Sequence, residues 1–157
     1  MKMFAGLRLA LHLGMVAALA FYCEARADAQ DPDLPATFGQ ATLQSGFTPD
    51  PHVAKLTAGG DIETKLGGQR AWVAKAPDYK LTFTPGKLPL TFYVESDDDT
   101  TLLINLPDGT WVADDDSGGG TNPLLRFANP QEGRYDIWVG TFGKDTAPAT
   151  LKITELK

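Results

Sequence analysis

The segment from Leu88 to Gly140 constrains the fold of this chain more than any other part of the sequence. It reads LPLTFYVESDDDTTLLINLPDGTWVADDDSGGGTNPLLRFANPQEGRYDIWVG, with short runs of alternating apolar and polar residues separated by Gly, Pro, Asp and Asn. Alternation with a period of two is typical of strands that bury one face, and many short strands between frequent turns are typical of sandwiches and barrels. The sequence therefore predicts an all-β domain.

Residues 37–157 are predicted to form one antiparallel β-sandwich of ten short strands. The prolines and glycines between the apolar runs disfavour any long helix in this part of the chain. The predicted strands are Phe38–Leu43, His52–Thr57, Ala71–Lys75, Lys80–Thr84, Pro89–Ser96, Thr100–Leu106, Thr110–Ala113, Leu124–Ala128, Arg134–Thr141 and Thr150–Glu155.

Alternation also predicts which side chains face the core. Four strands carry large apolar residues at every second position, and burial of each such side chain stabilises a fold by roughly 1.5–3 kcal/mol. The inward sets are Leu88, Leu90, Phe92 and Val94; Leu102, Ile104 and Leu106; Tyr135, Ile137 and Val139; and Ala149, Leu151 and Ile153. These four strands are expected to supply most of the core.

Residues 1–27 have the pattern of a cleavable export signal. Two basic residues precede an apolar stretch, Leu9–Tyr22, that is shorter than a membrane-spanning helix requires, and small residues follow at cleavage spacing. We expect cleavage after Ala27 or Ala29, a periplasmic or extracellular location, and no membrane insertion. The acidic, proline-containing residues 28–36 are expected to form a flexible leader.

Removal of the signal leaves a strongly acidic protein without cysteine. Residues 1–27 hold three basic residues and one acidic residue, so the rest keeps 11 basic and 19 acidic residues and a formal net charge of −8. Such a surface repels nucleic acid and attracts cations or basic partners. The only cysteine, Cys23, leaves with the signal, so stability must come from an apolar core, with or without bound ions.

Two aspartate triplets make calcium the candidate cofactor. Calcium takes six to eight oxygen ligands, and the triplets could supply several of them if their strands end on the same rim. The candidate ligands are Asp97, Asp98, Asp99, Asp114, Asp115, Asp116 and Asn122. The alternative is that both triplets are solvated turns that cap strand ends.

Two aromatic residues are candidates for an exposed ligand-binding platform. By alternation Trp138 lies on the opposite side of its strand from Ile137 and Val139, and Tyr93 lies opposite Phe92. If both face outward, their rings could stack on a sugar or contact a peptide. The alternative is that Trp138 packs beneath a loop.

Three features then occur in a fixed order. They are the turn Pro107-Asp108-Gly109, the loop Asp115-Asp116-Ser117-Gly118-Gly119 and the segment from Pro130 to Val139. This order resembles the bacterial pre-peptidase C-terminal domain family over about Leu88–Leu156. The resemblance implies a jelly-roll-like β-sandwich that is non-catalytic, assists secretion or substrate attachment, and in some members binds calcium. Most members accompany a protease domain, and no such domain is found among these residues.

An alternative function is a secreted hydrolase of the serine-peptidase type. The residues Asp116-Ser117-Gly118-Gly119 resemble the nucleophile loop of trypsin-like peptidases. A serine nucleophile needs a histidine base, however, and His52 is the only histidine outside the signal. A second alternative is a cell-surface subunit that assembles through its strand edges.

The prediction from sequence is therefore an exported, monomeric, non-catalytic binding or accessory module. Its partner is a protein or a polysaccharide rather than a nucleic acid, and calcium is a candidate structural ion.

Overall fold

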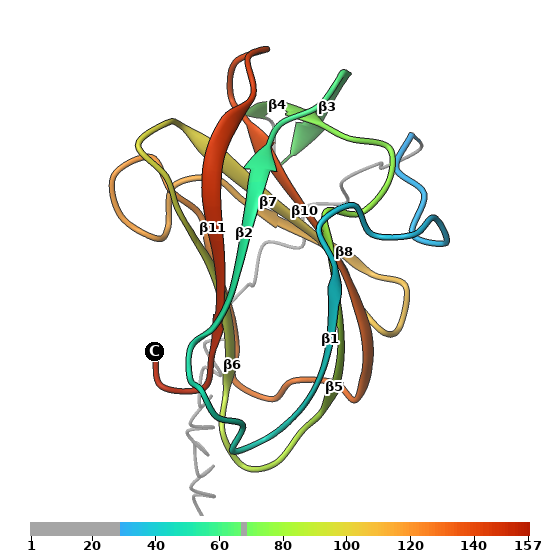
Figure 1. Ribbon diagram of the computed structural model, residues 1–157, viewed down its shortest axis with the longest axis vertical. Helices are drawn as coiled ribbons and strands as arrows, with labels where there is room; N and C mark the ends of the chain where they lie inside the picture. The colour runs from blue at the N-terminus through green and yellow to red at the C-terminus, as the bar shows by residue number, and fades with distance from the viewer. Residues whose placement is uncertain (1–28, 67–68) are drawn as a thin grey trace, which may run out of the picture.

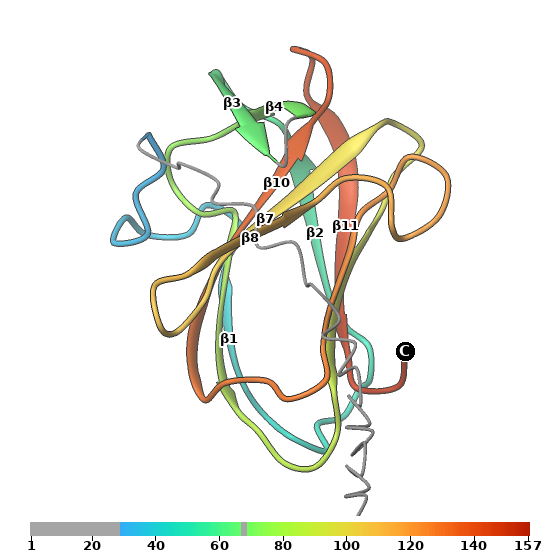
Figure 2. The ribbon, with the colours of Figure 1, turned by 180° about the vertical axis from the view of Figure 1, so that it is seen from behind.

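The structure is a computed structural model that describes residues 29–66 and 69–157. The predicted signal peptide, residues 1–27, lies outside the described residues. Within them the chain forms eleven strands and no helix, which confirms the all-β prediction (Figures 1 and 2). The described residues accordingly include no helix that is long and apolar enough to cross a membrane.

The strands are short, as the sequence predicts. In chain order they are β1 (Gln40–Gln44), β2 (His52–Ala58), β3 (Ile62–Leu66), β4 (Gln69–Val73), β5 (Tyr79–Thr84), β6 (Leu90–Glu95), β7 (Thr100–Asn105), β8 (Trp111–Asp114), β9 (Leu124–Phe127), β10 (Gly133–Thr141) and β11 (Ala147–Thr154).

Two sheets pack face to face around one core (Figure 1). Sheet A has seven strands in the order β1-β5-β10-β4-β3, with β7 also paired to β10 and β8 paired to β7. Sheet B has four strands in the order β2-β11-β6-β9. From β5 onward the chain crosses repeatedly between the sheets, so each sheet contains strands that are distant in sequence.

The core contains nearly all of the side chains that alternation placed there. Leu90, Phe92 and Val94 on β6, and the inward sets on β7, β10 and β11, are buried. Leu88 is the exception, because it is 42% exposed and lies before the first residue of β6. Alternation predicts facing only within a strand, and the inward set was extended two residues too far.

Two features of the sheets differ from the prediction. Strand β3 was not predicted, although Ile62 and Thr64 alternate with the exposed charged residues Glu63 and Lys65. Strand β1 pairs in parallel with β5, from Gln40 opposite Lys80 to Gln44 opposite Thr84. The wholly antiparallel prediction is therefore wrong at this edge: three strands separate β1 from β5, so no hairpin turn has to reverse the chain between them.

Strand β10 has a gap in its pairing, which the buried side chain of Asp78 fills. On one side β10 pairs with β5 up to Ile137 and with β4 at Thr141, so Val139 lacks a strand partner there. The carboxylate oxygen Oδ2 of Asp78 accepts a hydrogen bond from the Val139 N–H at 2.7 Å. The Gly59 N–H donates to the Val139 carbonyl at 2.8 Å, so both backbone groups of Val139 are satisfied.

The outer face of sheet A carries a second apolar cluster. Ala71 and Val73 from β4, Leu103 from β7 and Trp138 from β10 are all fully buried there. The half-buried Trp111 packs on Trp138, with ring centroids 5.1 Å apart, and the Trp138 indole N–H donates to the carbonyl of Lys75. Sheet A is therefore apolar on both faces in this region.

The segment predicted as a flexible leader is attached to the domain by hydrogen bonds from residue 31 onward. The Asp31 N–H donates to the same Lys75 carbonyl at 2.9 Å, and the Lys80 ammonium donates to the carbonyl of Pro32 at 2.8 Å. Arg134 forms ion pairs with Asp33 at 3.3 Å and with the buried Asp136 at 2.9 Å. These residues lie against sheet A and do not extend away from it.

Stability is expected to depend on pH through Asp78. Burial raises the pKa of Asp78 to about 7, although the hydrogen bond from Val139 opposes the shift. The unfolded chain releases this proton near pH 3.8, so between pH 3.8 and about 7 the folded state binds more protons. The free energy of unfolding should therefore fall by up to roughly 4 kcal/mol as pH rises through that window, and stay low above it.

The substitution Asp78→Asn tests this dependence, because the amide oxygen can still accept the Val139 N–H and carries no charge. Urea unfolding at pH 5, 6, 7 and 8 should show a smaller loss of stability for Asp78→Asn than for the unchanged protein. Glu132→Gln, an exposed substitution in the β9–β10 turn, serves as the control for charge removal. Parallel curves for the unchanged protein and Asp78→Asn would contradict the assignment.

Candidate functional site

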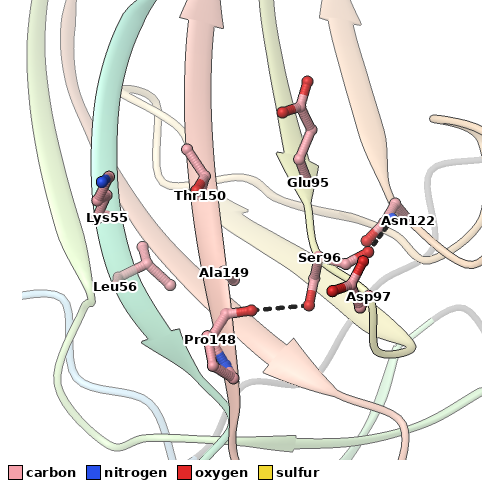
Figure 3. Close-up of a pocket in the computed structure, with 9 residues that line it drawn as sticks. All are labelled: Lys55, Leu56, Glu95, Ser96, Asp97, Asn122, Pro148, Ala149 and Thr150. Atoms are coloured by element: carbon pink, nitrogen blue, oxygen red, sulfur yellow. Dashed lines mark hydrogen bonds between the residues drawn. The ribbon is translucent and has the colours of Figure 1, made fainter.

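An open groove of about 620 Å³ crosses the outer face of sheet B at the end near the β6–β7 loop (Figure 3). We call it the sheet B groove. Most of its walls are polar, and its two ends differ in charge. Its lining residues are Lys55, Leu56, Glu95, Ser96, Asp97, Asn122, Pro148, Ala149 and Thr150.

The strand register sets the row of side chains across this groove. Thr150 on β11 lies opposite Lys55 on β2 and opposite Glu95 on β6. Leu151 is fully buried on the other face of the sheet, so Thr150 points outward by alternation. The row therefore runs from an ammonium group through a hydroxyl to a carboxylate, over about 10 Å at the usual spacing of neighbouring strands.

Hydrogen bonds fix the wall formed by the β6–β7 and β8–β9 loops. The Asn122 amide donates to the Ser96 carbonyl at 2.9 Å, and the Thr100 hydroxyl donates to the Asn122 amide oxygen at 2.7 Å. The Ser96 hydroxyl donates to the Pro148 carbonyl at 2.8 Å, as the dashed lines in Figure 3 show. This wall is held in place before any ligand arrives.

Two charged groups in the groove have no partner among the residues that the structure describes. Neither the Lys55 ammonium nor the Asp97 carboxylate forms an ion pair or a side-chain hydrogen bond there. Glu95, in contrast, pairs with the Lys152 ammonium at 2.6 Å. Lys55 and Asp97 are therefore the groups with free capacity to bind a ligand.

The predicted aromatic platform is not formed. Trp138 is fully buried on the outer face of sheet A, whereas Tyr93 lies on β6 in sheet B, so the two rings belong to different faces. The Tyr93 ring is contacted by two ammonium groups, with Lys157 at 4.0 Å and Lys152 at 5.8 Å from its centroid. The prediction for Trp138 is wrong because its face of sheet A is itself packed and closed.

The structure brings the two aspartate triplets together at one rim. Burial, followed by the negative charges of Asp116 and Asp115, raises the pKa of Asp99. Burial, followed by the charges of Asp116 and Asp114, raises the pKa of Asp115. The approach of the triplets, which the calcium prediction requires, is therefore present. We call Asp97, Asp98, Asp99, Asp114, Asp115 and Asp116 the aspartate rim.

Two of the predicted calcium ligands already bind groups of the protein. Asp114 accepts hydrogen bonds from the Ser117 N–H at 3.0 Å, the Ser117 hydroxyl at 2.6 Å and the Leu124 N–H at 2.9 Å. Asn122 joins the two loops as described above. Among the residues that the structure describes, no group of three or more His, Cys, Asp or Glu side chains is placed to hold a metal ion.

Two other residues of the triplets line a smaller cavity. Asp98 and Asp99 border a space of about 220 Å³ together with Asp145 and Thr141. The Phe142 N–H donates to the Asp99 carbonyl at 3.1 Å, which attaches this loop to the end of β10. Calcium binding at the aspartate rim stays a prediction.

Ser117 and His52 have separate partners. The Ser117 hydroxyl donates to Asp114, and the His52 imidazole shares a 2.8 Å hydrogen bond with the Tyr79 hydroxyl. Strand β2, which begins at His52, is at one edge of sheet B, and β9, which follows the Ser117 loop, is at the other. Burial lowers the pKa of His52, which disfavours its protonated form. These hydrogen bonds provide no serine–histidine pair.

Most of the groove residues were not found from the sequence. Asp97 and Asn122 were singled out for calcium, but Lys55, Glu95 and Thr150 were not identified as candidate site residues. Alternation gives the face of each residue, whereas the row across three strands requires the register between β2, β11 and β6. Nothing in the sequence around Thr150 specifies that register.

The comparisons with known proteins add a distant structural likeness. A scan against protein-family models finds no match, and a search of curated proteins finds none. The structure is similar to that of Aeromonas hydrophila PliG, a periplasmic lysozyme inhibitor of g-type lysozyme. The similarity covers 74% of this chain and 96% of that chain, with 15% sequence identity and a TM-score of 0.39.

Adjacent aspartates in the rim are expected to affect stability in opposite directions. Asp114→Ala removes the acceptor of three hydrogen bonds and should lower the free energy of unfolding by about 1–3 kcal/mol. Asp115→Ala removes a charge that its neighbours repel, so it should raise the free energy of unfolding by about 0.3 kcal/mol at low salt. Chemical denaturation at 20 mM and 500 mM NaCl measures both effects.

Added salt separates the two causes. The gain from Asp115→Ala should shrink at high salt because repulsion between partly exposed charges is screened, whereas the loss from Asp114→Ala should persist. Equal losses from both substitutions would show that the loop depends on all of its carboxylates alike.

Proposed function

We propose that this protein is an exported, monomeric, non-catalytic β-sandwich that binds a protein or polysaccharide partner in the sheet B groove. The observation that carries the proposal is the groove itself, which is open, polar and fixed by hydrogen bonds between its loops. Lys55 and Asp97, which have no partner within residues 29–66 and 69–157, offer one charge of each sign to a ligand.

The geometry supports binding over the hydrolase alternative. A serine nucleophile requires a base that takes its proton, and Ser117 donates to a carboxylate that also caps the loop backbone. The glycines that follow Ser117 have a conformational explanation. Gly119 and Gly120 have φ values of 107° and 64°, a region in which glycine is favoured over other residues.

We also propose that the domain is of the jelly-roll type, as the resemblance to the pre-peptidase C-terminal domain family implies. The order β2-β11-β6-β9 in sheet B, facing β5-β10-β7-β8 in sheet A, supports this proposal. A jelly roll consists of eight strands in two such sheets. Strands β1, β3 and β4 are then additions to the edges of sheet A.

Export is supported by the sequence pattern of residues 1–27 and agrees with the architecture. The domain has a core built from both sheets, and the only cysteine lies within the predicted signal. Such a core needs no disulfide in an oxidising compartment. The acidic surface favours a partner other than nucleic acid.

Filling the groove is expected to abolish binding. Thr150→Phe places a ring at the centre of the row and keeps a residue that is favourable in strands. Two-dimensional amide NMR titrations would use three octapeptides, Lys/Arg-rich, Ser/Thr/Gln-rich and Glu-rich, and two oligosaccharides, one neutral and one uronate-containing. At least one probe should shift the amides of Lys55, Ser96 and Thr150, with affinity at least about tenfold weaker in Thr150→Phe.

Thr82→Phe is the matched control, because Thr82 is an exposed strand residue on the outer face of sheet A. It should leave the titrations unchanged. The proposal is wrong if no probe shifts the groove amides, or if Thr150→Phe binds every probe as tightly as Thr82→Phe does.

We further propose that calcium binds at the aspartate rim near Asp99 and Asp115, whose pKa values are raised by burial and by neighbouring carboxylates. Calcium at 2 mM should raise the melting temperature by several degrees relative to EDTA, because a ligand that binds only the folded state stabilises it. Asp99→Asn should remove most of this shift and Glu132→Gln none of it. Identical melting in calcium and in EDTA would exclude the site.

A further inference from the structure

The two ends of the sheet B groove differ in charge. At the β2 end the only charged lining residue is Lys55, whereas the β6 end has Glu95 and Asp97 (Figure 3). The Glu95 charge is matched by Lys152, but the Asp97 carboxylate is exposed and has no partner among the described residues. The β6 end therefore has an unmatched negative charge on the groove wall.

The surface beyond that end is also acidic. From Leu88 to Leu125 the sequence contains eight acidic residues and no lysine or arginine. This stretch supplies both loops of the groove wall, Ser96–Asp99 and the loop between β8 and β9. A ligand that enters from the β6 end therefore first meets the aspartate rim.

Two carboxylates of the rim, Asp99 and Asp115, lie close to other negative charges. The pKa of Asp99 is raised by burial and by Asp116 and Asp115, and the pKa of Asp115 by burial and by Asp116 and Asp114. Carboxylates matched by nearby cations would instead have lowered pKa values. Neighbouring carboxylates therefore contribute to the raised pKa values of Asp99 and Asp115, and a cationic partner would offset their charge.

The groove lining also argues against a sugar as the main ligand. None of its nine residues is aromatic, and aromatic side chains are the usual apolar surface on which sugars stack. The neighbouring Tyr93 ring is already contacted by Lys152 and Lys157. The remaining lining chemistry of carboxylates, hydroxyls and an amide suits hydrogen bonding to ammonium, guanidinium and peptide groups.

Resting on the proposed binding function, we infer that the partner is a basic protein that lays an extended, Lys/Arg-rich segment across the aspartate rim into the sheet B groove. A cationic side chain of that segment meets Asp97 at the β6 end. The segment's backbone passes over Thr150. Lys55 at the β2 end repels a further cation and limits how far the basic part of the segment extends.

Opposite effects of two groove substitutions test this inference. The probe is a fluorescein-labelled octapeptide rich in Lys and Arg, followed by anisotropy in 0.1 M NaCl, where the Debye length is about 10 Å. Asp97→Asn should weaken binding by about 2–5-fold, and Lys55→Gln should strengthen it by about 2–5-fold, as expected for partly exposed charge pairs. A general loss of structure could not strengthen binding in one variant.

Glu132→Gln is the matched control, because it removes one negative charge near the start of β10. The rim adjoins the end of β10, about 26 Å away along the strand. The effect of Glu132→Gln on peptide binding should therefore be much smaller than that of Asp97→Asn. Raising NaCl to 0.5 M should weaken binding of the unchanged protein and reduce the difference between Asp97→Asn and that protein.

Several outcomes overturn the inference while leaving the proposed function intact. One is a neutral peptide or an oligosaccharide that binds in the groove, is lost in Thr150→Phe, and exceeds the cationic peptide in affinity. Another is a cationic peptide that responds to Asp115→Asn but not to Asp97→Asn or Thr150→Phe, while a different probe binds in the groove, because the cationic peptide then binds the loop between β8 and β9 instead. If none of these probes binds the groove, both the inference and the proposed function are wrong.

Discussion

Strand β10 is the element on which the rest of the structure depends, because its backbone is shared among β4, β5 and β7. Its inward side chains, Tyr135, Ile137 and Val139, lie in the core between the sheets, while Trp138 anchors the apolar cluster on the outer face of sheet A. The buried backbone N–H and C=O groups of such a strand need hydrogen-bond partners along its whole length. The carboxylate of Asp78 meets this requirement at Val139, and the cost of burying it is a pKa raised to about 7.

The groove depends on this core only indirectly. Inward packing of Leu56, Ala149 and Val94 fixes the outward direction of Lys55, Thr150 and Glu95 on the other face of sheet B. The β6–β7 and β8–β9 loops are then joined by Asn122, so the wall that carries Asp97 is held by hydrogen bonds. The rigid part of the site comes from sheet B, whereas its charge comes from the loops.

The aspartates of the rim have different roles although they are adjacent in sequence. Asp114 caps the loop by accepting three hydrogen bonds, whereas burial, followed by the charges of neighbouring carboxylates, raises the pKa values of Asp99 and Asp115. The first role stabilises the loop, and the second leaves a negative field. A basic partner or a cation would be attracted by that negative field. Adjacent aspartates of one triplet, Asp114 and Asp115, thus serve loop stability and the proposed binding function respectively.

The sequence by itself determined the all-β class, the presence of every strand except β3 and the inward residues of four strands, because alternation and turn residues act over a few neighbouring positions. It also placed the aspartates in loops. Only the tertiary structure decided that the triplets meet, that Trp138 is buried under Trp111, and that Lys55, Thr150 and Glu95 form one row. These facts depend on register and packing between strands far apart in the chain, and alternation within one strand carries no information about either.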